Sequence, residues 1–214
     1  MNEQLRVTEI FHSLQGESRT VGWPTAFVRL TGCPQRCVYC DTEYAFSGGS
    51  RMSVGDILAA VRGFGVRFVT VTGGEPLAQK GCLDLLSRLA DEGYEVSLET
   101  GGAMDVSAVD PRVVKVMDLK TPASGEEGRN RYENLAYLSA KDQIKFVIMD
   151  EGDYRWSTEQ LQSRALDQCA EVLFSPAAGF QEPAQLAEWI LRDRLPVRFQ
   201  LQLHKILWGA ERGR

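Results

Sequence analysis

Short apolar runs that alternate with amphipathic helical patterns are the feature of this chain that most limits its possible folds. Many of these runs are apolar at successive positions, as strands are when both of their faces are covered. They occupy residues 26–30, 68–72, 95–99, 113–118, 143–148, 171–174 and 197–201. The sequence therefore predicts a parallel sheet with helices on its faces.

Capping residues and apolar spacing predict the helices between these runs. Ser53 can cap a helix whose apolar positions follow directly, and Gly93 can end a helix that begins near Cys82. The other helices are expected at residues 131–140, 157–168 and 183–191. Ser157 and Gln160 suit a capping box at the start of the second of these.

The number of alternating units sets the architecture. Roughly six β/α units are too few for the complete eight-fold barrel, which usually needs about 250 residues. We therefore expect one domain over residues 1–214, built as a partial, open (β/α)6-like barrel. Its functional groups should line the C-terminal ends of the strands.

The first predicted strand leads into a C-x3-C-x2-C run formed by Cys33, Cys37 and Cys40. Three thiolates can hold three irons of a [4Fe-4S] cluster, whereas a structural zinc site or a fully ligated cluster needs four protein ligands. The fourth iron is then open to the amino and carboxylate arms of S-adenosylmethionine (SAM). A zinc site completed by His12 or His204 and a redox dithiol of Cys37 and Cys40 remain alternatives.

The remaining thiols and the composition favour an intracellular enzyme. Cys82 and Cys169 lie in apolar helical patterns and are expected to be buried core thiols. Clustered thiols without a secretory signal indicate a reducing, cytoplasmic compartment. A net charge of -5 argues against a broad nucleic-acid surface, and the chain has no apolar run long enough to cross a membrane.

Three loops after consecutive predicted strands carry polar and glycine residues. The first is TGGEP at residues 72–76, where glycines allow a ligand close to the backbone and a carboxylate can accept from an ammonium group. The second is LETGG at residues 98–102. The third is DLKTP at residues 118–122, whose lysine could meet an anionic ligand.

The C-x3-C-x2-C run and GGEP together resemble the radical SAM superfamily. Other segments narrow the resemblance to the 7-carboxy-7-deazaguanine synthases, chiefly LQGE at residues 14–17 and CDT at residues 40–42. The further matching segments are FVRLTGC at 27–33, ETG at 99–101 and LQLHK at 201–205. The matches thus extend over most of the chain.

The resemblance implies a radical ring contraction in 7-deazapurine biosynthesis. The substrate is expected to be 6-carboxy-5,6,7,8-tetrahydropterin, and the products 7-carboxy-7-deazaguanine and ammonia. In this family, reductive cleavage of SAM starts the reaction and SAM is regenerated at its end. Mg²⁺ assists by contacting the substrate. An electron donor such as flavodoxin and a homodimer are also implied, whereas nucleic-acid and membrane partners are not.

Site residues carry over from the resemblance position by position. The metal ligands are expected to be Cys33, Cys37 and Cys40 for the cluster and Thr42 for Mg²⁺. The SAM side is expected to comprise Tyr39, Asp41, Gly73, Gly74, Glu75, Gly102, Asp118 and Lys120. The substrate side is expected to comprise Leu14, Gln15, Gly16, Glu17, Arg29 and Thr100.

Other interpretations of these residues stay open at this point. Arg29 could form an ion pair at a strand end, Thr42 could cap a helix, and Gln15 with Gly16 could form a plain turn. Ser18 stands where many members of the family have glycine. A different radical SAM enzyme, such as a glycyl-radical activase acting on a protein, shares the cysteine and GGEP motifs but not the LQGE and CDT signatures.

Overall fold

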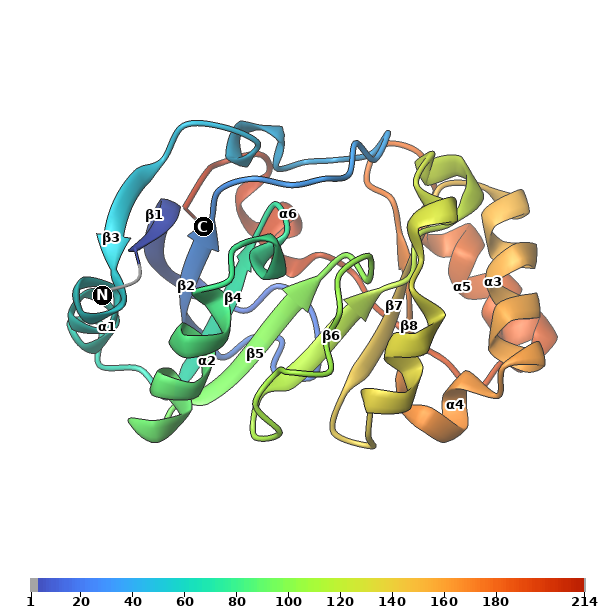
Figure 1. Cartoon of the computed structure of the whole chain (residues 1–214). Helices are drawn as coiled ribbons and strands as arrows, with labels where there is room; N and C mark the ends of the chain where they lie inside the picture. Colours follow the sequence, from blue (N-terminus) through green and yellow to red (C-terminus); the bar gives the residue numbers. More distant parts are fainter. Residues whose placement is uncertain (1–3, 214) are drawn as a thin grey trace.

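The computed structural model describes residues 4–213, and over this part of the chain one nine-stranded sheet curves through the molecule (Figure 1). The strand order is β3-β1-β2-β4-β5-β6-β7-β8-β9. The strands are β1 (Gln4–Leu14), β2 (Pro24–Leu30), β3 (Ser50–Ser53), β4 (Phe68–Gly73), β5 (Glu95–Thr100), β6 (Val114–Asp118), β7 (Gln143–Ile148), β8 (Glu171–Pro176) and β9 (Arg198–Phe199).

The parallel part of the sheet confirms the predicted fold class. Strands β2, β4, β5, β6, β7, β8 and β9 pair in parallel in that order, so the sheet is an open, partial barrel. The last predicted strand, at residues 197–201, is shortened to Arg198–Phe199.

Two strands at the edge of the sheet were not predicted. β1 pairs antiparallel with β2 and also with β3. The prediction missed β1 because Arg6, Glu9 and His12 interrupt its apolar residues. An antiparallel strand with one partly solvated face tolerates such charged residues.

Helices cover the outer face of the sheet on both sides of the molecule (Figure 1). They are α1 (Val54–Arg62), α2 (Cys82–Asp91), α3 (Glu151–Ser163), α4 (Leu166–Cys169) and α5 (Pro183–Asp193). The last helix, α6 (Leu203–Trp208), has residues in the lining of the cavity described below. Ser53 caps α1 as predicted, in a capping box in which Asp56 bonds back to the N-cap backbone. Gly93, with φ 85°, follows the end of α2, as expected for a helix-terminating glycine.

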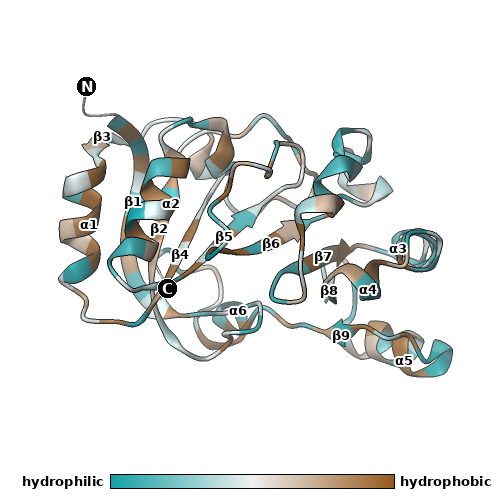
Figure 2. Ribbon diagram, turned by 60° about the horizontal axis from the view of Figure 1, so that its bottom comes forward, coloured by the Kyte–Doolittle hydropathy of each residue, from teal (hydrophilic) through white to brown (hydrophobic). Residues whose placement is uncertain are grey.

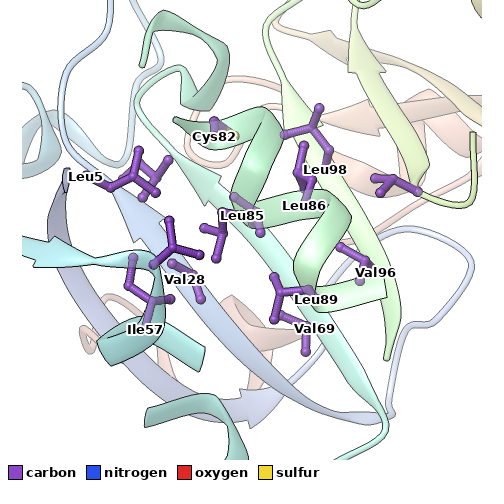
Figure 3. Packing of buried hydrophobic residues seen from close by; sticks show 14 of the residues in the cluster. Leu5, Val28, Ile57, Val69, Cys82, Leu85, Leu86, Leu89, Val96 and Leu98 are labelled. Atoms are coloured by element: carbon purple, nitrogen blue, oxygen red, sulfur yellow. The ribbon is translucent and has the colours of Figure 1, made fainter. Parts of the chain in front are cut away.

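Two apolar clusters hold the helices against the sheet. In the first, Leu85, Leu86 and Leu89 of α2 pack with Val28 and Val69 from the strands (Figure 3). The second lies under α3, α4 and α5 and contains Phe146 and Phe174, whose rings pack edge to face with centroids 5.5 Å apart. The apolar residues follow the strands and the sheet-facing side of the helices (Figure 2). Among residues 4–213, no helix is long and apolar enough to cross a membrane.

Three local predictions were wrong. Residues 131–140 form the short 3-10 helix Tyr132–Tyr137 instead of an α-helix. The helix expected at 157–168 starts earlier, at Glu151, after the N-cap residue Asp150, whose side chain accepts from the N–H of Asp153. Ser157 is therefore inside α3, where it is buried, and does not cap it. Cys169 is only partly buried, whereas Cys82 is fully buried as expected.

Candidate functional site

A cavity of about 560 Å³ opens on the concave face of the sheet. It extends from the loops at the C-terminal ends of the parallel strands to a floor near their N-terminal ends. Most of the predicted site residues line it: Leu14, Gln15, Gly16, Glu17, Arg29, Cys33, Cys37, Tyr39, Cys40, Asp41, Thr42, Gly73, Gly74, Thr100, Asp118 and Lys120. The exceptions are Glu75 and Gly102, which lie behind the cavity wall.

The cysteine loop follows β2 and brings its three thiols to the cavity. The backbone N–H of Gln35 donates to Cys33, and that of Thr42 donates to Cys40. Burial raises the pKa of all three thiols, that of Cys37 to about 11, so without a metal they are neutral. Backbone N–H groups directed at sulfur suit thiolate ligands of an iron–sulfur cluster.

Glycine is required where the GGEP loop packs against the cysteine loop. A Cβ on Gly74 would lie 2.7 Å from Cys33 Cβ and would collide with the carbonyl of Gly32. Gly73 has φ 154°, and a Cβ there would strike the Leu30 backbone. The close approach of these two loops thus depends on residues that lack side chains.

The zinc alternative is not supported by the positions of the histidines. His12 lies outside the cavity lining and stacks on Phe64, with centroids 5.7 Å apart. His204 lines the cavity but packs on Gly16. Within residues 4–213, no three His, Cys, Asp or Glu side chains are arranged to hold a single metal ion.

Glu75 supports the cavity wall instead of facing the cavity. It is 1% exposed, and its carboxylate accepts from Thr100 Oγ1 at 2.9 Å and from the N–H of Gly101 at 2.8 Å. The N–H of Leu77 is a third donor, at 3.1 Å. Gly102, with φ 72°, accepts through its carbonyl from Asn134 Nδ2 at 3.1 Å. Glu75 thus joins the first strand-end loop to the second, and Gly102 joins the second to the segment that contains Asn134.

The third loop contributes a buried ion pair, and it and the cysteine loop each contribute a buried polar atom without a partner. Lys120 Nζ lies 2.8 Å from Asp118 Oδ2 and 5.5 Å from the ring centre of Tyr39. Although burial opposes it, the neighbouring Asp118 raises the pKa of Lys120, so the ammonium keeps its charge. Within the described residues, Tyr39 Oη and Asp118 Oδ1 are buried without a hydrogen-bond partner. Such atoms carry a desolvation cost that a polar ligand can remove.

The segment Leu14–Glu17 corrects the expectation that all functional groups lie at the C-terminal strand ends. Leu14 pairs with Pro24, the first residue of β2. The antiparallel strand β1 therefore ends where β2 begins, at the opposite end of the strand from the cysteine loop. From this end, the side chain of Gln15 enters the barrel, where its Nε2 donates to Thr70 Oγ1 of β4 at 2.9 Å. This segment therefore forms the floor of the cavity.

Lys145, which the sequence analysis missed, lies at the centre of this floor. Its Nζ is 2.9 Å from Glu17 Oε2 and 3.8 Å from Glu99 Oε2. Burial raises the pKa of Glu99 to about 7, whereas Lys145 and Gln202 lower the pKa of Glu17 despite its burial. The floor thus holds one carboxylate that is firmly ionised and one that protonates near neutrality. A lone lysine inside the apolar run at 143–148 was the available signal for this site.

Arg29 enters the cavity from β2 and pairs with an acid on the unpredicted strand β1. Arg29 Nε donates to Glu9 Oε1 at 2.7 Å, and Tyr44 Oη donates to the same oxygen at 2.8 Å. The guanidinium lies 5.7 Å from the ring centre of Phe11. The ion pair that was the alternative interpretation of Arg29 therefore exists, at a residue that also lines the cavity.

The C-terminal segment closes the cavity between its floor and the cysteine loop. Gly16 O accepts from the N–H of Leu203 at 2.9 Å, and any side chain at Gly16 would collide with His204. Lys205 Nζ lies 2.6 Å from Asp41 Oδ2, an ion pair that lowers the pKa of Asp41 to about 2 although burial opposes the shift.

Thr42 is next to this ion pair. Its hydroxyl donates to Asp41 Oδ1 at 2.8 Å. Thr42 also precedes the 3-10 helix Glu43–Ala45, but its side chain makes no capping hydrogen bond there. The hydroxyl oxygen is therefore at the cavity and not engaged with a helix end.

Comparisons with known proteins agree with this geometry. The family model described as the radical SAM superfamily matches residues 27–118. The 7-carboxy-7-deazaguanine synthase of Chlorobaculum tepidum is 45% identical over 97% of this chain and 96% of its own length, and that of Koribacter versatilis is 43% identical over 97% and 98%. The crystal structure of QueE from Escherichia coli matches with a TM-score of 0.77 and 25% identity, covering 94% of this chain and 95% of QueE. The chain therefore belongs to the 7-carboxy-7-deazaguanine synthase family of radical SAM enzymes.

Proposed function

We propose that the cavity converts 6-carboxy-5,6,7,8-tetrahydropterin into 7-carboxy-7-deazaguanine, the radical ring contraction that this family performs in 7-deazapurine biosynthesis. The observation that carries the proposal is one cavity with three thiols and Arg29 near the C-terminal strand ends and Glu17 and Lys145 toward its floor. The [4Fe-4S] cluster and SAM of this superfamily, when bound, supply the carbon radical that starts the reaction.

The upper side of the cavity suits the cofactors. Cys33, Cys37 and Cys40 would hold the cluster, because the backbone N–H groups beside Cys33 and Cys40 favour their thiolate forms. The unpartnered atoms of Tyr39 and Asp118 offer hydrogen bonds to SAM. Lys120, Asp41, Gly73 and Gly74 would complete the SAM side, whereas Glu75 and Gly102 would act by supporting it.

Arg29 and the residues of the cavity floor suit an anionic pterin. Arg29 presents a planar guanidinium to the substrate carboxylate, and the aromatic rings beside it exclude water. Ionised Glu17 can accept from the amino-pyrimidine edge of the pterin, and Lys145 keeps it ionised. Leu14, Gln15, Gly16 and Thr100 would fix the orientation of the ring system.

Mg²⁺ would bind at Thr42, between these two sides. A hydroxyl oxygen is a suitable ligand for a hard cation that keeps much of its shell as water or substrate. The neighbouring carboxylate of Asp41 adds negative charge near the site. Lys205 partly neutralises that charge.

Several broader assignments accompany this function. A reductant must supply the electron that the superfamily's chemistry consumes, and we assign this role to a flavodoxin-type donor. We further propose that residues 1–214 form a single radical SAM domain that works as a homodimer. Free, clustered thiols favour a reducing cytoplasm.

The direct test is to reconstitute the cluster anaerobically and add SAM, dithionite and the carboxytetrahydropterin. We expect 7-carboxy-7-deazaguanine and ammonia in equal amounts, without net loss of SAM. Reductive SAM cleavage without any deazapurine, by a protein with a full cluster, would refute the proposed substrate.

A further inference from the structure

The peptide group between Ser18 and Arg19, one residue beyond Glu17 at the cavity floor, is held at both of its polar atoms. The carbonyl of Ser18 accepts from Arg198 Nη2 at 2.6 Å. The N–H of the same peptide group, on Arg19, donates to Gln143 Oε1 at 3.1 Å. This peptide group cannot turn without losing both hydrogen bonds.

The two side chains that hold this peptide meet at one carboxylate oxygen. Glu171 Oε2 accepts from Gln143 Nε2 and lies 3.5 Å from Arg198 Nη1. Arg19 Nε is also 3.5 Å from it. Glu171 and Gln143 are the first residues of β8 and β7 and are paired in register, so the sheet itself fixes their positions. We call Glu171, Gln143 and Arg198 the floor clamp.

The conformation of the clamped segment needs such support. Ser18 has φ 64°, in the left-handed region, although it is not glycine. This conformation costs about 1–2 kcal/mol for a residue with a side chain. It persists where the surroundings determine it more strongly than the local preference does. The floor clamp supplies those surroundings from below the cavity.

We propose that Glu171 is a positioning residue for the pterin substrate. Through Gln143 and Arg198 it fixes the Ser18–Arg19 peptide. With Ser18 held in its left-handed conformation, this sets the direction in which the neighbouring Glu17 carboxylate enters the cavity. Lys145 and Gln202 then hold that carboxylate at 2.9 Å each. The inference rests on the proposed contact between Glu17 and the substrate. Glu171 itself does not line the cavity.

If the Glu171 ion pairs only stabilised the fold, removing them would leave substrate binding unchanged. Another ion pair at the start of a parallel strand provides a matched control for this alternative. Glu95 is likewise the first residue of a parallel strand, and it pairs with Arg67 at the surface. Its partner makes no hydrogen bond to the floor segment among the described residues. Glu95→Ala therefore removes a comparable strand-end ion pair without affecting the floor clamp.

The experiment compares Glu171→Ala with Glu95→Ala after cluster reconstitution. We expect Glu171→Ala to raise KM for 6-carboxytetrahydropterin about fivefold, the size of a coupling between neighbouring groups. Its cluster content and its SAM cleavage without pterin should match wild type. Glu171→Gln, which keeps an oxygen acceptor for Gln143, should recover part of the affinity. Glu95→Ala should leave KM unchanged.

The double variant Glu171→Ala/Glu17→Gln distinguishes failure of the positioning role from failure of the proposed substrate contact. If Glu171 acts through Glu17, then Glu171→Ala should add little to the raised KM of Glu17→Gln. A raised KM for Glu17→Gln together with a normal KM for Glu171→Ala would overturn the positioning role and leave the proposed function intact. An unchanged KM for Glu17→Gln would overturn the substrate contact itself, and the positioning role with it.

Discussion

Arg29 and Glu9 face each other directly across the β1–β2 pair, and their side chains form a 2.7 Å ion pair beside the cavity that Arg29 lines. The side chains are 16% and 22% exposed, so the pair is largely removed from water. Within the described residues, the pair uses only Nε of the guanidinium. Because Arg29 lines the cavity, its terminal nitrogens are available to a ligand, while Glu9 orients the head group.

Arg29→Lys should weaken pterin binding while SAM binding is spared. Lysine keeps the charge but loses the planar fork, which corresponds to roughly the 1.5–3 kcal/mol of a charge-assisted hydrogen bond. Equilibrium binding of each compound to the reconstituted protein measures this. If affinity for SAM and pterin fell equally, Arg29 would have a structural role only.

Cys37→Ala should remove the stable four-iron cluster and all turnover, because each thiolate holds one iron. Circular dichroism should show an unchanged fold, since Cys37 is in a loop outside the two apolar clusters. Cys169→Ala, at a partly buried thiol that is not part of the cavity lining, is the control and should keep the full cluster. Turnover by Cys37→Ala would disprove the ligand assignment.

Thr42 should make turnover respond to Mg²⁺. Thr42→Ser keeps an oxygen and should preserve most of the stimulation, whereas Thr42→Ala should abolish it. The absorption spectrum of the cluster should be the same in both variants. Identical Mg²⁺ titrations for wild type and Thr42→Ala would place the metal elsewhere.

Glu99 should make the protein less stable as pH rises toward neutrality. Burial raises its pKa from 4.5 in the unfolded chain to about 7, so between these values the folded state binds the extra proton. Stability must then fall with rising pH, by at most about 1.4 kcal/mol per pH unit for one group. Glu99→Gln should flatten the dependence of Tm on pH across this window. An unchanged slope would mean that Glu99 titrates normally.

Ser18→Gly should stabilise the fold. Glycine adopts φ 64° without steric cost, and the change removes only a 3.3 Å contact with Thr20 Oγ1. We expect a gain of about 1 kcal/mol, or about 2–4 °C in Tm. Ala165→Gly, at φ 48° and outside the cavity, should give a similar gain and serves as a comparison. A lower Tm for Ser18→Gly alone would show that glycine loosens the floor.

The sequence allowed the parallel strands and the cysteine side of the site to be predicted because both depend on local patterns. Apolar runs mark β4 to β8, and three cysteines within one loop must lie close together. The floor was not predictable in this way. Glu9 lies on β1, which was not predicted because charged residues interrupt its apolar pattern. Lys145 has its role only through the carboxylates of Glu17 and Glu99, which are 128 and 46 positions away in the chain. No sequence pattern indicated that the carboxylate of Glu75, predicted on the SAM side, accepts hydrogen bonds from Thr100 and Gly101 of the neighbouring loop.

The contact between Gly16 and the Leu203–His204 segment also bears on the order in which the site forms during synthesis. The cysteine loop packs against β2 and the GGEP loop, both encoded within the first half of the chain. The floor requires Gln202 at a separation of 185 residues and Arg198 at 180. Because distant contacts form only after the intervening chain is available, the cluster side can assemble on the ribosome before the substrate side exists. A nascent chain arrested near residue 190 would then be able to take up iron and sulfide while still lacking a pterin site.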